Sequence, residues 1–163
     1  MSEINGINVT EIKNFKESVK KDPSQADRDP IMVVKWTGGD GAEVEYNGIK
    51  SNFGGEKHLN AMQMQLAALA ACDIEVIAVH SALLGLKINN LSIEVKGHFN
   101  VQSYLGIENT SGSGYDAIEL VVHLEAPGIM PDQVQYLIDR LEKSSPVGDT
   151  LNRQIPIKLE FHK

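Results

Sequence analysis

The stretch from Leu59 to Leu86 decides the fold, and it reads LNAMQMQLAALAACDIEVIAVHSALLGL. Good helix formers dominate it, and only Gly85, near its end, weakens a helix. At about 100° per residue, one face carries Gln65, Ala68, Leu69, Cys72, Glu75, Val76 and Val79, and the opposite face carries Ala67, Ala70, Ile74, Ile77 and Ser81. Because a helix that is apolar nearly all round must be enclosed on all sides, we expect a partner subunit to cover what one small sheet leaves open.

Charge and cysteine usage exclude several classes of protein. Asp73, Glu75 and His80 interrupt the middle of the long apolar segment, so we expect a soluble core helix and no membrane partner. The 163 residues include 22 acidic and 15 basic ones, for a formal charge of −7, which is the wrong sign for binding nucleic acid. The single cysteine, Cys72, cannot form an intramolecular disulfide, and the charged N-terminus does not resemble a signal peptide, so we expect a cytoplasmic protein.

The rest of the chain predicts an α+β fold in a single domain, without repeats. A capping pattern at Asn8 predicts a helix over residues 9–21, and residues 23–30 read as a linker, so that residues 1–30 precede a main body of residues 31–163. A loop at 111–114 is expected between two of the strands, and a further amphipathic helix is expected from Pro131 to Lys143. Strands are predicted at residues 31–36, 42–46, 49–53, 91–96, 118–124 and 155–161.

Cys72 is the residue on which the chemistry depends. A reactive cysteine needs a cation, a helix N-terminus or a metal to stabilise its thiolate, whereas Cys72 lies mid-helix with Asp73 beside it and Glu75 one turn on. The alternative, from composition alone, is that Cys72 is unreactive and serves as a small buried hydrophobic residue. A metal site built from Cys72, Glu75 and His80 lacks the close His or Cys pairs of zinc signatures, so we expect no metal and no cofactor.

Several short motifs of the chain are similar to those of a known family. Through them the chain resembles the OsmC/Ohr family of thiol peroxidases over about residues 31–163, and the Leu-Ala-Ala-Leu-Ala-Ala-Cys helix is the most specific of these motifs. The N-terminal helix and the Tyr104-Leu105-Gly106 loop resemble one OsmC-like subgroup. The resemblance implies an α+β fold in an intertwined homodimer, with the two central helices packed against each other. The motifs are Trp36-Thr37-Gly38-Gly39, Gly54-Gly55, Asn60, Gln65-Leu66-Ala67-Ala68-Leu69-Ala70-Ala71-Cys72 and Ser145-Pro146-Val147-Gly148-Asp149-Thr150-Leu151.

The resemblance also implies thiol chemistry in the oxidative or osmotic stress response. Family enzymes reduce hydroperoxides with two cysteines, a peroxidatic one on the long helix and a second one in a Cys-Pro turn after the last helix. Carried onto this chain, the peroxidatic position is Cys72 and the second cysteine falls on Ser145, which is not a thiol. Recycling of a Cys72 sulfenic acid would then require an external thiol reductant. The activating glutamate of organic hydroperoxide resistance members is replaced by Met62, and the first hairpin, around Asp40, has no arginine.

The sequence therefore supports two hypotheses about the function. A one-cysteine peroxidase requires positive charge near Cys72, from Lys57, from His58 or from an arginine of the partner chain. The alternative is a catalytically inactive OsmC-like homodimer that binds a small apolar ligand in an interface pocket, or a purely structural homodimer without that pocket. The residues expected to line the interface pocket are Met62, Met64 and Leu69.

Overall fold

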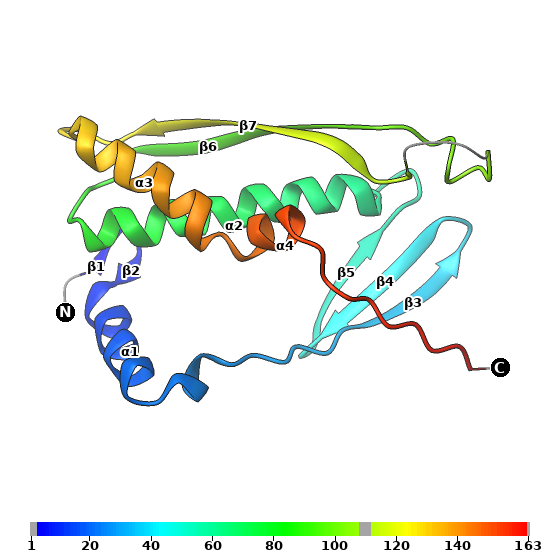
Figure 1. Cartoon of the computed structure of the whole chain (residues 1–163), viewed down its shortest axis with the longest axis horizontal. Coiled ribbons are helices and arrows are strands. Elements are labelled where there is room, and N and C mark those ends of the chain that lie inside the picture. Colours follow the sequence, from blue (N-terminus) through cyan, green and yellow to red (C-terminus); the bar gives the residue numbers. More distant parts are fainter. Residues whose placement is uncertain (1–2, 108–111, 163) are drawn as a thin grey trace.

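The structure is a computed structural model and describes residues 3–107 and 112–162. Figure 1 shows its helices and strands, which confirm the predicted α+β class. In chain order they are β1 (Glu3–Ile4), β2 (Ile7–Asn8), α1 (Val9–Lys21), the 3₁₀ helix η1 (Pro23–Ala26), β3 (Val33–Gly38), β4 (Gly41–Tyr46), β5 (Ile49–Phe53), α2 (Ala61–Leu83), β6 (Asn90–Phe99), β7 (Tyr115–Glu125), α3 (Pro131–Ser144) and α4 (Pro146–Asn152).

The N-terminal helix α1 begins where the capping pattern placed it. The Asn8 side chain accepts hydrogen bonds from the backbone N–H groups of Thr10 and Glu11, which satisfies two donors of the first turn. The short hairpin β1–β2 before it is not among the predicted elements. Its turn residues Asn5 and Gly6 have φ of 55° and 74°, the left-handed conformation that an Asn-Gly pair adopts readily. The Asn5 amide also donates to the Leu86 carbonyl at 3.0 Å, which ties the hairpin to the end of α2.

The strands form two larger antiparallel sheets. Strands β3, β4 and β5 pair in that order, and β6 pairs with β7 along their length, with Asn90 opposite Glu125. In Figure 1 the β6–β7 ribbon lies over α2, while the β3–β5 sheet stands at the side of the molecule, away from that layer. The outer residues of β3 are correspondingly exposed, Trp36 by 79%.

Helix α2 is the core of the molecule and packs against β6, α3 and α4. Its N-terminus carries a capping box in which Asn60 and Gln63 exchange side-chain and backbone hydrogen bonds of 2.9 and 3.0 Å. By length and composition α2 could cross a membrane, but its contacts with β2, β6, α3 and α4 and the buried Asp73 at its middle are those of a core helix. The predicted helix over 59–86 is thus confirmed, with its ends at Ala61 and Leu83.

One predicted strand is absent from the structure, and one helix was not predicted. The expected strand at 155–161 is wrong, because residues 153–162 contain neither helix nor strand. Its alternating apolar residues suit a strand, but a strand needs a neighbouring edge for its hydrogen bonds, and here Ile157, Leu159 and Phe161 are all more than 80% exposed. In the loop expected at 111–114, residue 111 lies outside the described residues. Helix α4, directly after α3, is an addition to the predicted elements.

Candidate functional site

Cys72 lies on α2, where that helix meets the junction between α3 and α4. Ser145 ends α3 and caps α4, and its hydroxyl accepts the Gly148 N–H at 3.1 Å. The same hydroxyl donates toward Cys72 Sγ at 3.5 Å, a distance within the range for sulfur acceptors. The structure thus brings together the two residues that the resemblance pairs, although they are 73 positions apart in the sequence.

Asp73 is the charged group nearest to this pair in the sequence, and it is buried. Only 7% of its surface is exposed, and its Oδ1 atom has no hydrogen-bond partner. Burial raises the pKa of the Asp73 carboxyl above its ordinary value, and a hydrogen bond from Ser145 lowers it in part. The Ser145 hydroxyl therefore lies 3.5 Å from the Cys72 sulfur, and Ser145 lines the same cavity as Asp73.

Two cavities lie beside this cluster. The smaller one, of about 240 Å³, is lined by Cys72, Glu75, Val76, Val79, His80, Ser144 and Pro146. The larger one, of about 420 Å³, is lined by Leu69, Asp73, Ile118, Leu120, Val122, Ile138, Leu141, Glu142, Ser145, Gly148, Leu151 and Asn152. The half-buried Cys72 faces the first cavity, while Asp73 and Ser145 face the second. The helical face predicted to include Cys72, Glu75 and Val79 is therefore a cavity wall.

His80, on the wall of the Cys72 cavity, is held by α3. Its Nδ1 atom lies 2.8 Å from the Tyr136 hydroxyl. Burial first, and then the positive charges of Arg140 and Lys16, lower the pKa of His80 below 6.5. The imidazole is thus neutral at pH 7 and supplies no positive charge to the cavity. Within residues 3–107 and 112–162, no three His, Cys, Asp or Glu side chains come together to hold a metal ion, Cys72, Glu75 and His80 included.

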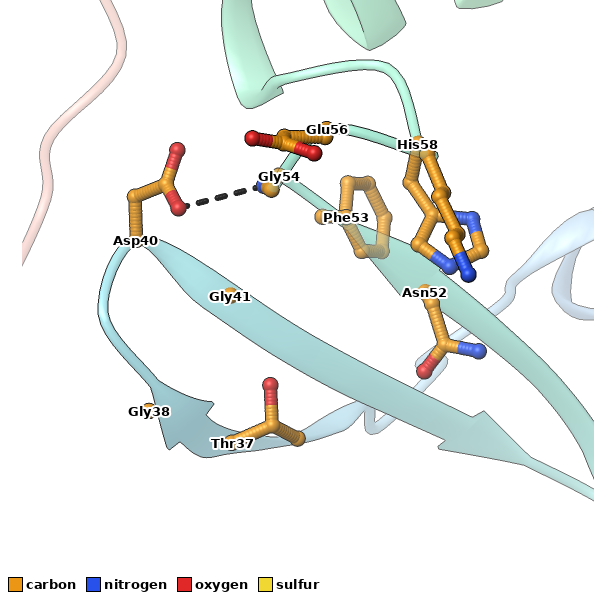
Figure 2. A pocket seen from close by; sticks show the side chains of 11 residues that line it. Thr37, Gly38, Asp40, Gly41, Asn52, Phe53, Gly54, Glu56 and His58 are labelled. Carbon is orange, nitrogen blue, oxygen red and sulfur yellow. Dashed lines mark hydrogen bonds between the residues drawn. The ribbon is translucent and has the colours of Figure 1, made fainter.

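A third cavity, of about 480 Å³, lies at the hairpin end of the molecule and contains the two predicted sources of positive charge, Lys57 and His58. Figure 2 shows its polar side chains, with the Asp40 carboxylate turned toward the Gly54-Gly55 backbone, where it accepts the Gly55 N–H at 3.1 Å. Asp40 thus ties the turn between β3 and β4 to the Gly54-Gly55 segment. Neither Lys57 nor His58 lines the Cys72 cavity of the same chain.

The apolar interface pocket expected from Met62, Met64 and Leu69 concerns two subunits and stays a prediction. Leu69 lines the larger cavity, whereas neither methionine lines any of the three cavities described above. Sequence reasoning considered Asp73 only as a charge that disfavours a thiolate, and did not place it beside Ser145. A signal for helix α4 was present, since a serine followed by proline is a common helix start.

The chain is similar in sequence and in fold to proteins of one family. A model of the OsmC-like protein family matches residues 54–160. An OsmC-like protein from Mycoplasma pneumoniae superposes with a TM-score of 0.65 at 17% identity, covering 77% of this chain and 89% of that one. An organic hydroperoxide resistance protein from Legionella pneumophila superposes with a TM-score of 0.53 at 18% identity, covering 77% of this chain and 90% of that one. OhrB, the organic hydroperoxide resistance protein of Bacillus subtilis, superposes with a TM-score of 0.50 at 12% identity, covering 82% of this chain and 97% of that one. No curated protein sequence matches the chain.

Proposed function

Because the chain belongs to the OsmC-like protein family, we propose that it reduces organic hydroperoxides through the thiol of Cys72 and is recycled by an external thiol. The observation that carries the proposal is the position of Cys72, half-buried on the wall of a cavity of about 240 Å³, with the Ser145 hydroxyl 3.5 Å from its sulfur. The names of the Legionella and Bacillus neighbours support the substrate class.

The reaction needs only one cysteine if a second thiol comes from solution. The Cys72 thiolate attacks one peroxide oxygen, the O–O bond breaks, and an alcohol and a Cys72 sulfenic acid result. A small thiol then condenses with the sulfenic acid and releases water, and a second molecule of that thiol reduces the mixed disulfide. Ser145 cannot perform the first of these reductive steps, because it has no sulfur. Such a cycle suits a reducing cytoplasm, where we place the protein.

We further propose that the working form is an intertwined homodimer. The exposed apolar surface of the single chain supports this, since it lies on two segments that make few contacts with the core, the β3–β5 sheet and the C-terminal stretch. Ile49 of β5 and Ile157 of the C-terminal stretch are 71% and 88% exposed. On α2, Ala68, Ala71 and Ile74 are exposed as well, as a helix that packs on its own copy would require.

A turnover assay tests the peroxidase proposal. Purified protein is mixed with cumene hydroperoxide and excess dithiothreitol, and loss of peroxide is compared with that for Cys72→Ser. We expect turnover with the native protein and none above background with the variant. Mass spectrometry after peroxide treatment without reductant should show one added oxygen on the peptide that contains Cys72. Equal turnover in the two proteins would contradict the proposal.

The alternative function, binding of an apolar ligand without catalysis, is favoured by a separate observation. The larger cavity, of about 420 Å³, has a mainly aliphatic wall that includes Leu69, Leu120 and Ile138. Saturable binding of a fluorescent fatty acid probe that is weakened by Leu120→Asp, together with absent peroxide turnover, would favour this alternative. Turnover that is lost with Cys72→Ser would exclude it as the sole function.

A further inference from the structure

We propose that Asp73 accepts the proton of the Cys72 thiol through the hydroxyl of Ser145, and that this path returns the proton to the leaving oxygen of the hydroperoxide. The inference rests on the proposed function. It assigns Ser145 and Asp73 to the activating role, since position 62 is Met62 and the first hairpin contains no arginine. In this arrangement Ser145 is the catalytic residue that touches the reacting sulfur, and Asp73 acts through it.

The geometry of Ser145 supports a path for a proton. Its hydroxyl accepts the Gly148 N–H at 3.1 Å, which fixes the oxygen at the start of α4. It has one proton to donate, and Cys72 Sγ lies 3.5 Å away as an acceptor; the unpartnered Oδ1 of Asp73 is a second acceptor on the cavity that Ser145 also lines. Because Ser145 is only 4% exposed, water does not readily replace either partner. A hydroxyl held in this way can accept a proton from the sulfur while it donates its own to the carboxylate.

Asp73 is suited to receive that proton. Its Oδ1 atom is buried and has no hydrogen-bond partner. A negative charge there is not stabilised by any donor, so protonation of the carboxyl is favoured. Burial raises the pKa of Asp73, in agreement with this. The other titratable group on its cavity is Glu142 of α3, while Glu75 and the neutral His80 of α2 face the Cys72 cavity. Strand β7 and helix α4 contribute only uncharged residues to the cavity that Asp73 faces.

The proposed step balances. The S–H proton of Cys72 moves to Ser145 Oγ as the Ser145 proton moves to Asp73, which leaves a thiolate and a neutral carboxyl group. The thiolate attacks the distal peroxide oxygen, so that an S–O bond forms and the O–O bond breaks; the sulfur is oxidised by two electrons and the peroxide is reduced. The leaving alkoxide takes a proton from Ser145, which regains one from Asp73. The carboxylate is then restored, and the external thiol reduces the sulfenic acid.

Two electrophiles with different proton requirements test the path. Iodoacetamide expels iodide, which needs no proton, whereas cumene hydroperoxide expels an alkoxide, which does. The ratio of their second-order rate constants with Cys72 therefore reports proton delivery separately from the amount of thiolate. We expect Asp73→Asn to lower this ratio about 100-fold, the lower end for general acid–base assistance. Alkylation also consumes the thiolate, so loss of the proton acceptor in Asp73→Asn should slow alkylation. It should slow it by a smaller factor than the reaction with the hydroperoxide, which needs the returned proton as well.

Three further variants make the test specific. Ser145→Ala should lower the ratio to the same extent, and Ser145→Thr, which keeps both a hydroxyl and a helix cap, should keep the ratio near that of the native protein. Asp139→Asn, on the exposed side of α3, is the matched control and should leave the ratio unchanged. Thermal unfolding of each variant establishes that it is folded. If Asp73→Asn changes both rate constants by the same factor, Asp73 acts only through its charge or on the fold, and the proposal is overturned.

The pH profile of alkylation separates this inference from the proposed function. A proton shared by Cys72 and Asp73 requires two steps in the alkylation profile of the native protein, and a single step in Asp73→Asn. One step in both proteins overturns the shared proton whatever the peroxide does. If native Cys72 is not oxidised by any hydroperoxide but its alkylation shows two steps that Asp73→Asn reduces to one, the peroxidase proposal fails while the proton coupling of Asp73 to Cys72 stands.

Discussion

Ser145 is the position to which the resemblance to the OsmC/Ohr family carries the second cysteine. Its hydroxyl oxygen lies 3.5 Å from Cys72 Sγ, so a thiol at position 145 would need only a small shift to form an S–S bond of about 2.05 Å. We predict that Ser145→Cys forms an intramolecular disulfide slowly when peroxide is added, detected as the loss of both free thiols.

The same variant should remain a poor peroxidase. Ser145→Cys would supply a second thiol for recycling, but it removes the hydroxyl through which the Cys72 proton is proposed to move. Met62 would still occupy the position to which the resemblance carries the activating glutamate. We expect steady-state turnover with cumene hydroperoxide and excess dithiol far below about 10 per second. The native protein is the reference. Turnover at ordinary enzyme rates would show that neither the hydroxyl nor the missing glutamate limits the reaction.

Asp73 should lower the stability of the fold at neutral pH. Its folded-state pKa is raised above 3.8, so the native state binds more protons than the unfolded state between these two values, and the stability present at low pH is lost as pH rises through the folded pKa. We predict that Asp73→Asn raises Tm by roughly 2–4 °C at pH 7, equivalent to about 1 kcal/mol, and has a smaller effect near pH 3. Calorimetry at the two pH values measures this, with Asp139→Asn as control, and a larger gain at pH 3 would contradict it.

At the level of elements, local signals in the sequence predicted α1 and α2 well. The Asn8 cap and the run of helix formers after Asn60 act within one or two turns of the chain. Helix α1 begins directly after its expected cap, and α2 begins at Ala61, close to the expected start at Leu59. The strand expected at 155–161 failed because pairing depends on another edge, which its own sequence does not describe. The position of Cys72 followed from local sequence and resemblance, whereas the proximity of Asp73 to Ser145 depends on how the α3–α4 junction packs on α2 and could not be predicted.

The contact between α2 and α3 should make the fold sensitive to acid. The pKa of His80 is lowered from 6.5, so the unfolded state binds more protons there, and stability present above about pH 6.5 is lost as pH falls toward the folded value. We predict that His80→Gln loses less stability than the native protein between pH 7 and pH 5 in urea unfolding. His162→Gln, on the exposed C-terminal stretch, should behave like the native protein. An unchanged pH dependence in His80→Gln would contradict the assignment.

At the level of the whole molecule, the single chain leaves several large apolar side chains uncovered. Helix α2 has 23 residues and runs about 35 Å at 1.5 Å per residue, yet it is covered by β6, α3 and α4 only in part. The separate β3–β5 sheet exposes Trp36 by 79%, and the C-terminal stretch exposes Leu159 by 87%. Exposed apolar surface on this scale marks an interface, and a second copy of the chain offers the same uncovered segments.

We therefore predict an obligate dimer at micromolar concentration in analytical ultracentrifugation. Ala71→Arg, which places a long charged side chain on the exposed face of α2, should shift the protein to monomers or to aggregates, because a charge buried between two helices without a partner costs several kcal/mol. Asn14→Arg, on the exposed face of α1, is the matched control and should sediment as the native dimer does. A native protein that sediments as a folded monomer would contradict the dimer, and would require that the β3–β5 sheet and residues 153–162 find their partners within one chain.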